Sequence, residues 1–118
     1  TSAEYQLAFD FLHSQTTKTI AFAETTQITE DLVVNGLNLN IASSPAIQQA
    51  YAESLLLNAY RENYEFVIWW CHRDYDALWQ TFPANIKDLG QLWRDSGLLD
   101  EDGNERPALG SWRRVYAQ

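Results

Sequence analysis

Basic residues, cysteine and methionine are scarce in this 118-residue sequence. It has 8 Lys and Arg against 16 Asp and Glu, a formal net charge of −8, one cysteine and no methionine. The sequence lacks the clusters of Lys and Arg that bind phosphate backbones and anionic membranes. We therefore expect neither nucleic acid nor a membrane as a partner. The single Cys71 cannot form a disulfide within the chain and supplies no cysteine-based metal framework.

Long apolar runs are missing as well. No stretch approaches the about 20 residues that cross a bilayer, so we predict no transmembrane segment. The length is that of one domain, and residues 1–118 are treated as a single segment. Because methionine is absent and the first residue is Thr1, we expect these residues to belong to a longer protein.

Hydrophobic periodicity predicts two long helices in the first half of the chain. The first covers residues 2–15, where Thr1 and Glu4 have the spacing of a capping box. The second covers residues 45–62, with Ser44 as its N-cap and a proline at its first position.

Two short segments, residues 19–23 and 66–71, are continuously apolar and rich in strand-forming residues. They are typical of strands buried on both faces of a parallel sheet, and the order helix, strand, helix, strand predicts a parallel βαβ unit in an α/β fold. Residues 25–43 are predicted to be a long polar loop whose short apolar stretches can fold locally. The remainder is predicted to be helical, with a turn at residues 100–104 and a last helix that begins at Pro107 and runs through Val115.

Two parallel strands do not by themselves make a stable sheet. Each predicted strand is as hydrophobic as the centre of a large sheet, and a parallel sheet needs both faces covered and both edges protected. We therefore expect either that the chain is part of a larger α/β domain or that several copies assemble to complete the sheet.

The carboxyl ends of parallel strands are where α/β proteins gather their reactive groups. Here these ends carry Glu24 and Trp70, and the alternation of strand residues predicts that both point to the same rim, with Phe22 on the face of Glu24. A carboxylate can attack an anomeric carbon, and sugars stack their C–H faces on aromatic rings. This pair favours a carbohydrate site that needs no metal or cofactor.

The other candidate binding residues lie around the end of the second strand: Trp69, His72, Arg73, Asp74, Tyr75 and Trp79. Trp69 and Trp70 face opposite sides of the strand, and we favour Trp70 for the rim and Trp69 for packing under helices. The polar residues after the strand either orient substrate hydroxyls or form a loop with a local pair between Arg73 and Asp74. Tyr75 and Trp79 can line a sugar cleft, although helix packing explains Trp79 equally well.

No metal site is predicted. His13 and His72 are far apart in the sequence, and the acidic turn at residues 100–105 lacks the glycine and glutamate positions of a calcium loop. Cys71 is expected to be a small buried residue rather than a nucleophile.

Three segments together resemble a known family: residues 18–25 (KTIAFAET), 66–70 (FVIWW) and 97–112 (GLLDEDGNERPALGSW). They resemble the last third of the clan A (β/α)8-barrel glycoside hydrolases, which include endo-β-galactanases and cellulases. The resemblance implies that the chain is the C-terminal part of a TIM barrel, strands 7 and 8 with their helices, from a retaining β-glycosidase that acts on a neutral polysaccharide. It implies Glu24 as the nucleophile and Trp70, or Trp69 if the register slips by one, as the sugar platform.

The sequence departs from this family in two places. Thr26 stands where a glycine is common, and the general acid/base Glu of strand 4 and its neighbouring Asn are absent from the chain. Because a retaining glycosidase needs two carboxyl groups about 5–5.5 Å apart, we expect the chain to be inactive alone and to act with the missing N-terminal barrel segment. The resemblance also implies a secreted or periplasmic protein.

Two alternatives remain open. The first is a noncatalytic carbohydrate-binding or oligomeric interaction module that uses the 14% aromatic content as stacking platforms, although such modules are mostly β-sandwiches. The second is a different α/β enzyme, whose missing part would bring a second carboxylate or a phosphate-binding loop.

Overall fold

The computed structural model describes residues 1–117 and contains a two-stranded parallel sheet. Strand β1 (Phe22–Thr25) pairs with β4 (Val67–Trp69), and the crossover between them includes helix α2 (Pro45–Arg61). The predicted parallel βαβ unit is therefore confirmed, and the chain has a mixed α/β fold. The register shifts between Phe22 and Thr25, which marks a bulge in β1.

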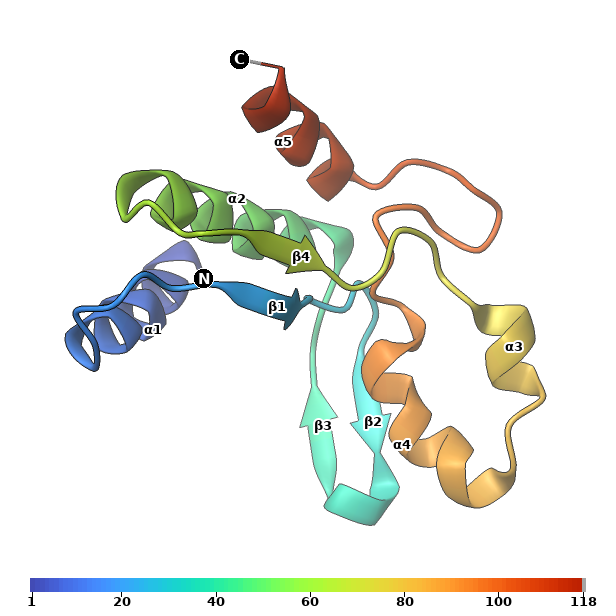
Figure 1. Ribbon diagram of the computed structural model, residues 1–118. Coiled ribbons are helices and arrows are strands. Elements are labelled where there is room, and N and C mark those ends of the chain that lie inside the picture. Colours follow the sequence, from blue (N-terminus) through green and yellow to red (C-terminus); the bar gives the residue numbers. More distant parts are fainter. Residues whose placement is uncertain (118) are drawn as a thin grey trace.

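Three helices cover one face of this sheet (Figure 1). Helix α1 (Ser2–Ser14) begins with the predicted capping box, and helix α5 (Pro107–Tyr116) begins with a proline, whose missing N–H is no loss in the first turn. Helix α2 packs against both of them, and Ser44 caps it by accepting a hydrogen bond from the Ile47 backbone. The predicted positions of these helices are confirmed.

The main core lies between α2, α5 and β4. Its buried members are Ala52, Leu56, Leu98, Ala108 and Trp112, against which Val67, Trp69 and Leu109 pack. Val67 and Trp69 alternate with Ile68 along β4, so this strand faces the helices with every second residue.

The opposite face of the sheet, which we call the bare face, is uncovered in the part of the chain that the structure describes. Phe66, Ile68 and Trp70 are 47%, 52% and 43% exposed, and neither outer edge of the sheet is paired among residues 1–117. The prediction that both faces of the strands are buried is therefore wrong for this chain, because the helices that pack on the strands lie on one side.

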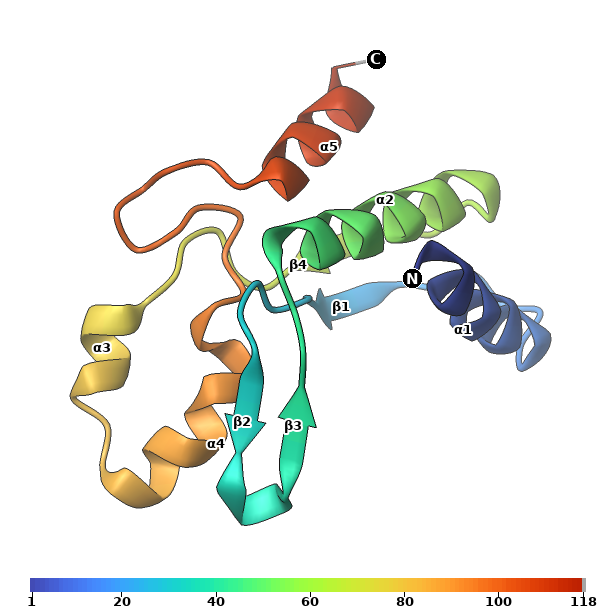
Figure 2. The ribbon, with the colours of Figure 1, turned by 180° about the vertical axis from the view of Figure 1, so that it is seen from behind.

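A second lobe extends beyond the carboxyl ends of β1 and β4 (Figures 1 and 2). It joins a hairpin, formed by β2 (Leu32–Val34), the 3-10 turn η1 (Asn35–Leu37) and β3 (Leu39–Ile41), to helices α3 (Asp76–Gln80) and α4 (Ala84–Arg94).

The hairpin replaces much of the predicted polar loop. Leu32 and Val34 alternate into a small core with Ile28, and Leu92 of α4 packs against it. The Asp88 carboxylate of α4 also accepts hydrogen bonds from the hairpin-turn backbone, including the Gly36 N–H at 2.8 Å. No helix within residues 1–117 is long and apolar enough to cross a membrane.

Candidate active site

Glu24 lies in β1 and is exposed. The next residue, Thr25, hydrogen-bonds the Tyr51 hydroxyl on α2, so Thr25 faces the helices and Glu24 points to the bare face. The Glu24 carboxylate has no hydrogen-bond or ion-pair partner within residues 1–117. A carboxylate left free at a strand end can act on a ligand.

Phe22 does not share the face of Glu24, and this prediction was wrong. Its ring packs against Phe9 of α1 and Tyr64, at centroid distances of 6.2 and 5.6 Å. The bulge between Phe22 and Thr25 explains the difference, because one extra residue in a strand moves the following side chains to the other face.

Trp69, the last residue of β4, and Trp70, which follows it, point to opposite sides. The Trp69 indole donates to the Ser96 carbonyl at 3.0 Å, and its ring lies 6.0 Å from the Trp112 ring. Trp70 follows on the bare face, and its backbone N–H donates to the Thr25 carbonyl at 2.9 Å. This hydrogen bond joins the carboxyl ends of the two strands, so Glu24 and Trp70 lie at the same edge and on the same face.

Tyr75 and His72 lie in the segment that follows β4. His72 is exposed and Tyr75 is half-buried. Burial raises the pKa of the Tyr75 phenol, while the neighbouring Trp70 side chain acts in the opposite direction.

Arg73 and Asp74 do not form the predicted local pair. Asp74 is instead bound by Arg106, with contacts of 2.5 and 3.0 Å, and accepts the Gly97 N–H at 2.7 Å. Arg73 donates to the Glu101 carbonyl. Both side chains therefore hold the loop after β4 to the segment before α5, an arrangement set by residues about thirty positions away.

Trp79 is engaged in packing between α3 and α4. Its indole N–H donates to the Lys87 carbonyl at 3.0 Å, and the Lys87 ammonium and the Arg94 guanidinium lie 4.5 and 4.8 Å from its ring centroid.

Cys71 is half-buried, its thiol donates to the Arg73 carbonyl, and burial raises the pKa of the thiol. A raised pKa keeps sulfur protonated, which disfavours a nucleophilic role.

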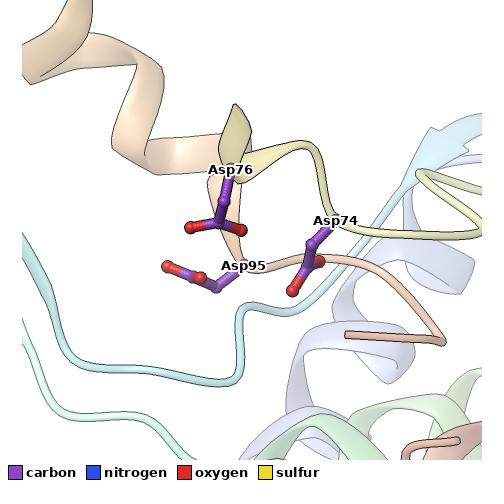
Figure 3. A group of neighbouring side chains, drawn as sticks. All are labelled: Asp74, Asp76 and Asp95. Atoms are coloured by element: carbon purple, nitrogen blue, oxygen red, sulfur yellow. The ribbon is translucent and has the colours of Figure 1, made fainter. Parts of the chain in front are cut away.

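Sequence reasoning missed one group of side chains. Asp74, Asp76 and Asp95 place a carboxylate oxygen each within 4.8 Å of one another, where the loop after β4, the start of α3 and the end of α4 meet (Figure 3). The sequence shows only that Asp74 and Asp76 are two residues apart, because it is tertiary packing that brings Asp95 close to them. Carboxylates in this number could coordinate a divalent cation.

Two guanidinium groups already neutralise much of this cluster. Arg94 contacts Asp95 at 2.6 Å and Asp76 at 3.7 Å, and Arg106 binds Asp74. Burial raises the pKa of Asp76, Asp95 raises it further, and one Asp76 oxygen is buried without a hydrogen-bond partner in the part of the chain that the structure describes. Ionised Asp76 is therefore unfavourable in the folded protein.

We predict that Asp76→Asn increases the free energy of unfolding at pH 7. The folded-state pKa of Asp76 lies above its unfolded value, so ionised Asp76 lowers stability only as the pH rises through the raised pKa. The gain in the free energy of unfolding should therefore disappear once the pH falls below the ordinary pKa of an aspartate. Urea unfolding of both proteins across this pH range measures it, with the exposed Asp102→Asn as the control. A gain that is equal at all pH values would contradict the charge explanation.

The chain was compared with protein-family models, with curated proteins and with solved structures, and none of them matches it. No role is therefore transferred to its residues from a matched protein. The support for a function comes from the geometry at the ends of β1 and β4 and from the residue pattern of the sequence.

Proposed function

We propose that the chain forms two neighbouring strands, with their helices, of the (β/α)8 barrel of a retaining β-glycosidase that acts on a neutral polysaccharide. Glu24 is the nucleophile, and Trp70 is the platform on which the sugar stacks. One observation carries the proposal: an unpartnered carboxylate and an exposed indole share one face at the carboxyl ends of two parallel strands.

Exposed apolar surfaces on three sides support the barrel. The bare face of the sheet carries Ile68 and Trp70, the far side of α1 carries Leu7 and Phe11, which are 69% and 68% exposed, and a groove beside α5 is lined partly by Leu57 of α2. A closed barrel needs an inward sheet face and helices packed on both flanks. We propose that the remaining barrel strands and their helices cover these surfaces, in preference to self-association of this chain.

The mechanism needs one group that this chain does not supply. In the proposal, Glu24 attacks the anomeric carbon, the bond from that carbon to the leaving oxygen breaks, and an acid from another strand protonates the oxygen. The same group then takes a proton from water, which hydrolyses the glycosyl ester and releases Glu24. Trp70 holds the sugar ring by its C–H face during both steps.

A trapping experiment tests this assignment. The complete protein is incubated with a dinitrophenyl 2-deoxy-2-fluoro-β-glycoside, whose leaving group departs without protonation and whose fluorine slows hydrolysis of the ester. We expect peptide mass spectrometry to find the fluorosugar on Glu24, and no label in Glu24→Gln. A label on a different carboxylate would overturn the assignment. Oligosaccharide binding without any label would favour the noncatalytic carbohydrate-binding module instead.

A further inference from the structure

The segment of residues 95–99 lies between the ends of both strands. It comes directly after α4, and its residues 95–98 are buried. On one side the Asp95 carbonyl accepts the backbone N–H and the hydroxyl of Thr29, at 2.9 and 3.0 Å. On the other side the Leu99 N–H donates to the His72 carbonyl at 2.9 Å. The segment therefore touches the chain that follows β1 and the chain that follows β4.

The Ser96 carbonyl oxygen, in this segment, binds residues that lie close in the chain to Glu24 and to Trp70. The Ser96 carbonyl accepts the Thr26 hydroxyl at 3.1 Å and the Trp69 indole N–H at 3.0 Å. Thr26 is two residues from Glu24, and Trp69 is next to Trp70. Thr26 and Trp69 therefore tie the backbone on both sides of the site to a single atom.

The position of this carbonyl is itself fixed. Gln48, fully buried on α2, donates to the Gly97 carbonyl at 3.0 Å and also reaches the Ser96 carbonyl at 3.5 Å. At Gly97 a Cβ atom would lie 2.6 Å from the Asp74 backbone nitrogen, so the segment approaches the loop after β4 too closely for a side chain. The Ser96 carbonyl cannot shift without breaking these contacts.

We propose that residues 95–97 position the site, and that the Thr26 hydroxyl and the Trp69 indole set the placement of Glu24 against Trp70 through the Ser96 carbonyl. The inference rests on the proposed function for its consequence in catalysis. In the glycoside hydrolase family that the chain resembles, a glycine is common at the position of Thr26. Glycine has no hydroxyl and cannot make this hydrogen bond. Thr26 and Trp69 are positioning residues, since neither is placed to touch the sugar.

The test compares variants that differ only in the hydroxyl. Thr26→Val keeps the shape and removes the donor, and Thr26→Ser keeps the donor. Thr81→Val is the control, because it removes a threonine hydroxyl bond to a backbone carbonyl, that of Leu78, outside the segment. In the complete protein, with an aryl β-glycoside, we expect Thr26→Val to lower kcat by about 10- to 100-fold with KM little changed. Thr26→Ser and Thr81→Val should retain the kcat of the parent protein. Thr26→Ala replaces Thr26→Val if the valine variant does not fold.

A second measurement does not depend on catalysis. With 5-fluorotryptophan incorporated, the fluorine resonance of Trp70 should shift between the parent protein and Glu24→Gln, because the substitution removes a carboxylate charge from the face that carries the indole. We expect Thr26→Val to reduce the shift and Thr26→Ser to restore it. If Glu24→Gln leaves turnover intact while the shift still follows the Thr26 hydroxyl, the proposed function fails and the positioning role stands. If Thr26→Val changes neither kcat nor the shift, the positioning role is overturned.

Discussion

Glu24→Gln in the complete protein should lower kcat on a β-glycoside by on the order of 10^4-fold, because removal of a nucleophile leaves only the rate supplied by binding and the remaining groups. Glutamine matches the shape of Glu24, which is exposed and has no partner within residues 1–117, so the change should not perturb the fold. KM should change little, since the substitution leaves Trp70 and the rest of the surface in place. Steady-state kinetics on an aryl β-glycoside measure both constants.

The matched control is Glu65→Gln. Glu65 is an exposed carboxylate just before the amino end of β4, whereas the proposed site lies at the carboxyl ends of the strands. It should keep the kcat of the parent protein. With Glu24→Ala, added azide should attack the anomeric carbon from the vacated side and yield the α-glycosyl azide. Unchanged hydrolysis in Glu24→Gln would remove Glu24 from the mechanism.

Arg106→Met should lower the free energy of unfolding by about 3–5 kcal/mol, because it leaves a buried carboxylate without its counter-charge. The Asp74 side chain is 0% exposed and the Arg106 side chain 10%. Methionine preserves the apolar stem of Arg106 but neither of its two bonds to Asp74. Urea unfolding measures the loss at pH 7.

The comparison for this prediction is Arg113→Met. Arg113 pairs with Glu105 at 2.7 Å, but both side chains are more than half exposed, so the loss of stability should be much smaller than for Arg106→Met. Burial already raises the pKa of Asp74, and loss of Arg106 raises it further. Below that pKa Asp74 is neutral, so the cost of Arg106→Met should shrink as the pH falls. Equal costs for the two variants would contradict a structural role for the buried pair.

Local signals in the sequence were enough to place the main elements. The capping box at Thr1, the N-cap at Ser44 and the proline at position 107 mark helix starts that the structure reproduces. The apolar runs located both strands of the parallel pair, although β1 (Phe22–Thr25) begins three residues later and ends two residues later than the run at residues 19–23. The hairpin escaped prediction because its core depends on Leu92 of α4, more than fifty residues away, rather than on its own short apolar stretches.

The candidate site was predictable only in part. Strand ends located Glu24 and Trp70, but the side on which Phe22 lies depends on a bulge, which the alternation rule does not anticipate. The partner of Asp74 is Arg106 on the segment before α5, and the tie between Thr26 and Trp69 passes through a backbone carbonyl. Such contacts come from tertiary packing, and no spacing in the sequence encodes them.

In the proposed function, β1 and β4 are neighbouring barrel strands and Glu24 is one of two catalytic carboxylates. An experimental structure of the complete protein that carries these residues tests this arrangement. We expect a parallel strand to pair with the outer edge of each of β1 and β4, and a second carboxyl group to lie about 5–5.5 Å from Glu24. An unpaired edge on either strand, or a nearest facing carboxyl group about 6.5 Å or more from Glu24, would overturn the proposal.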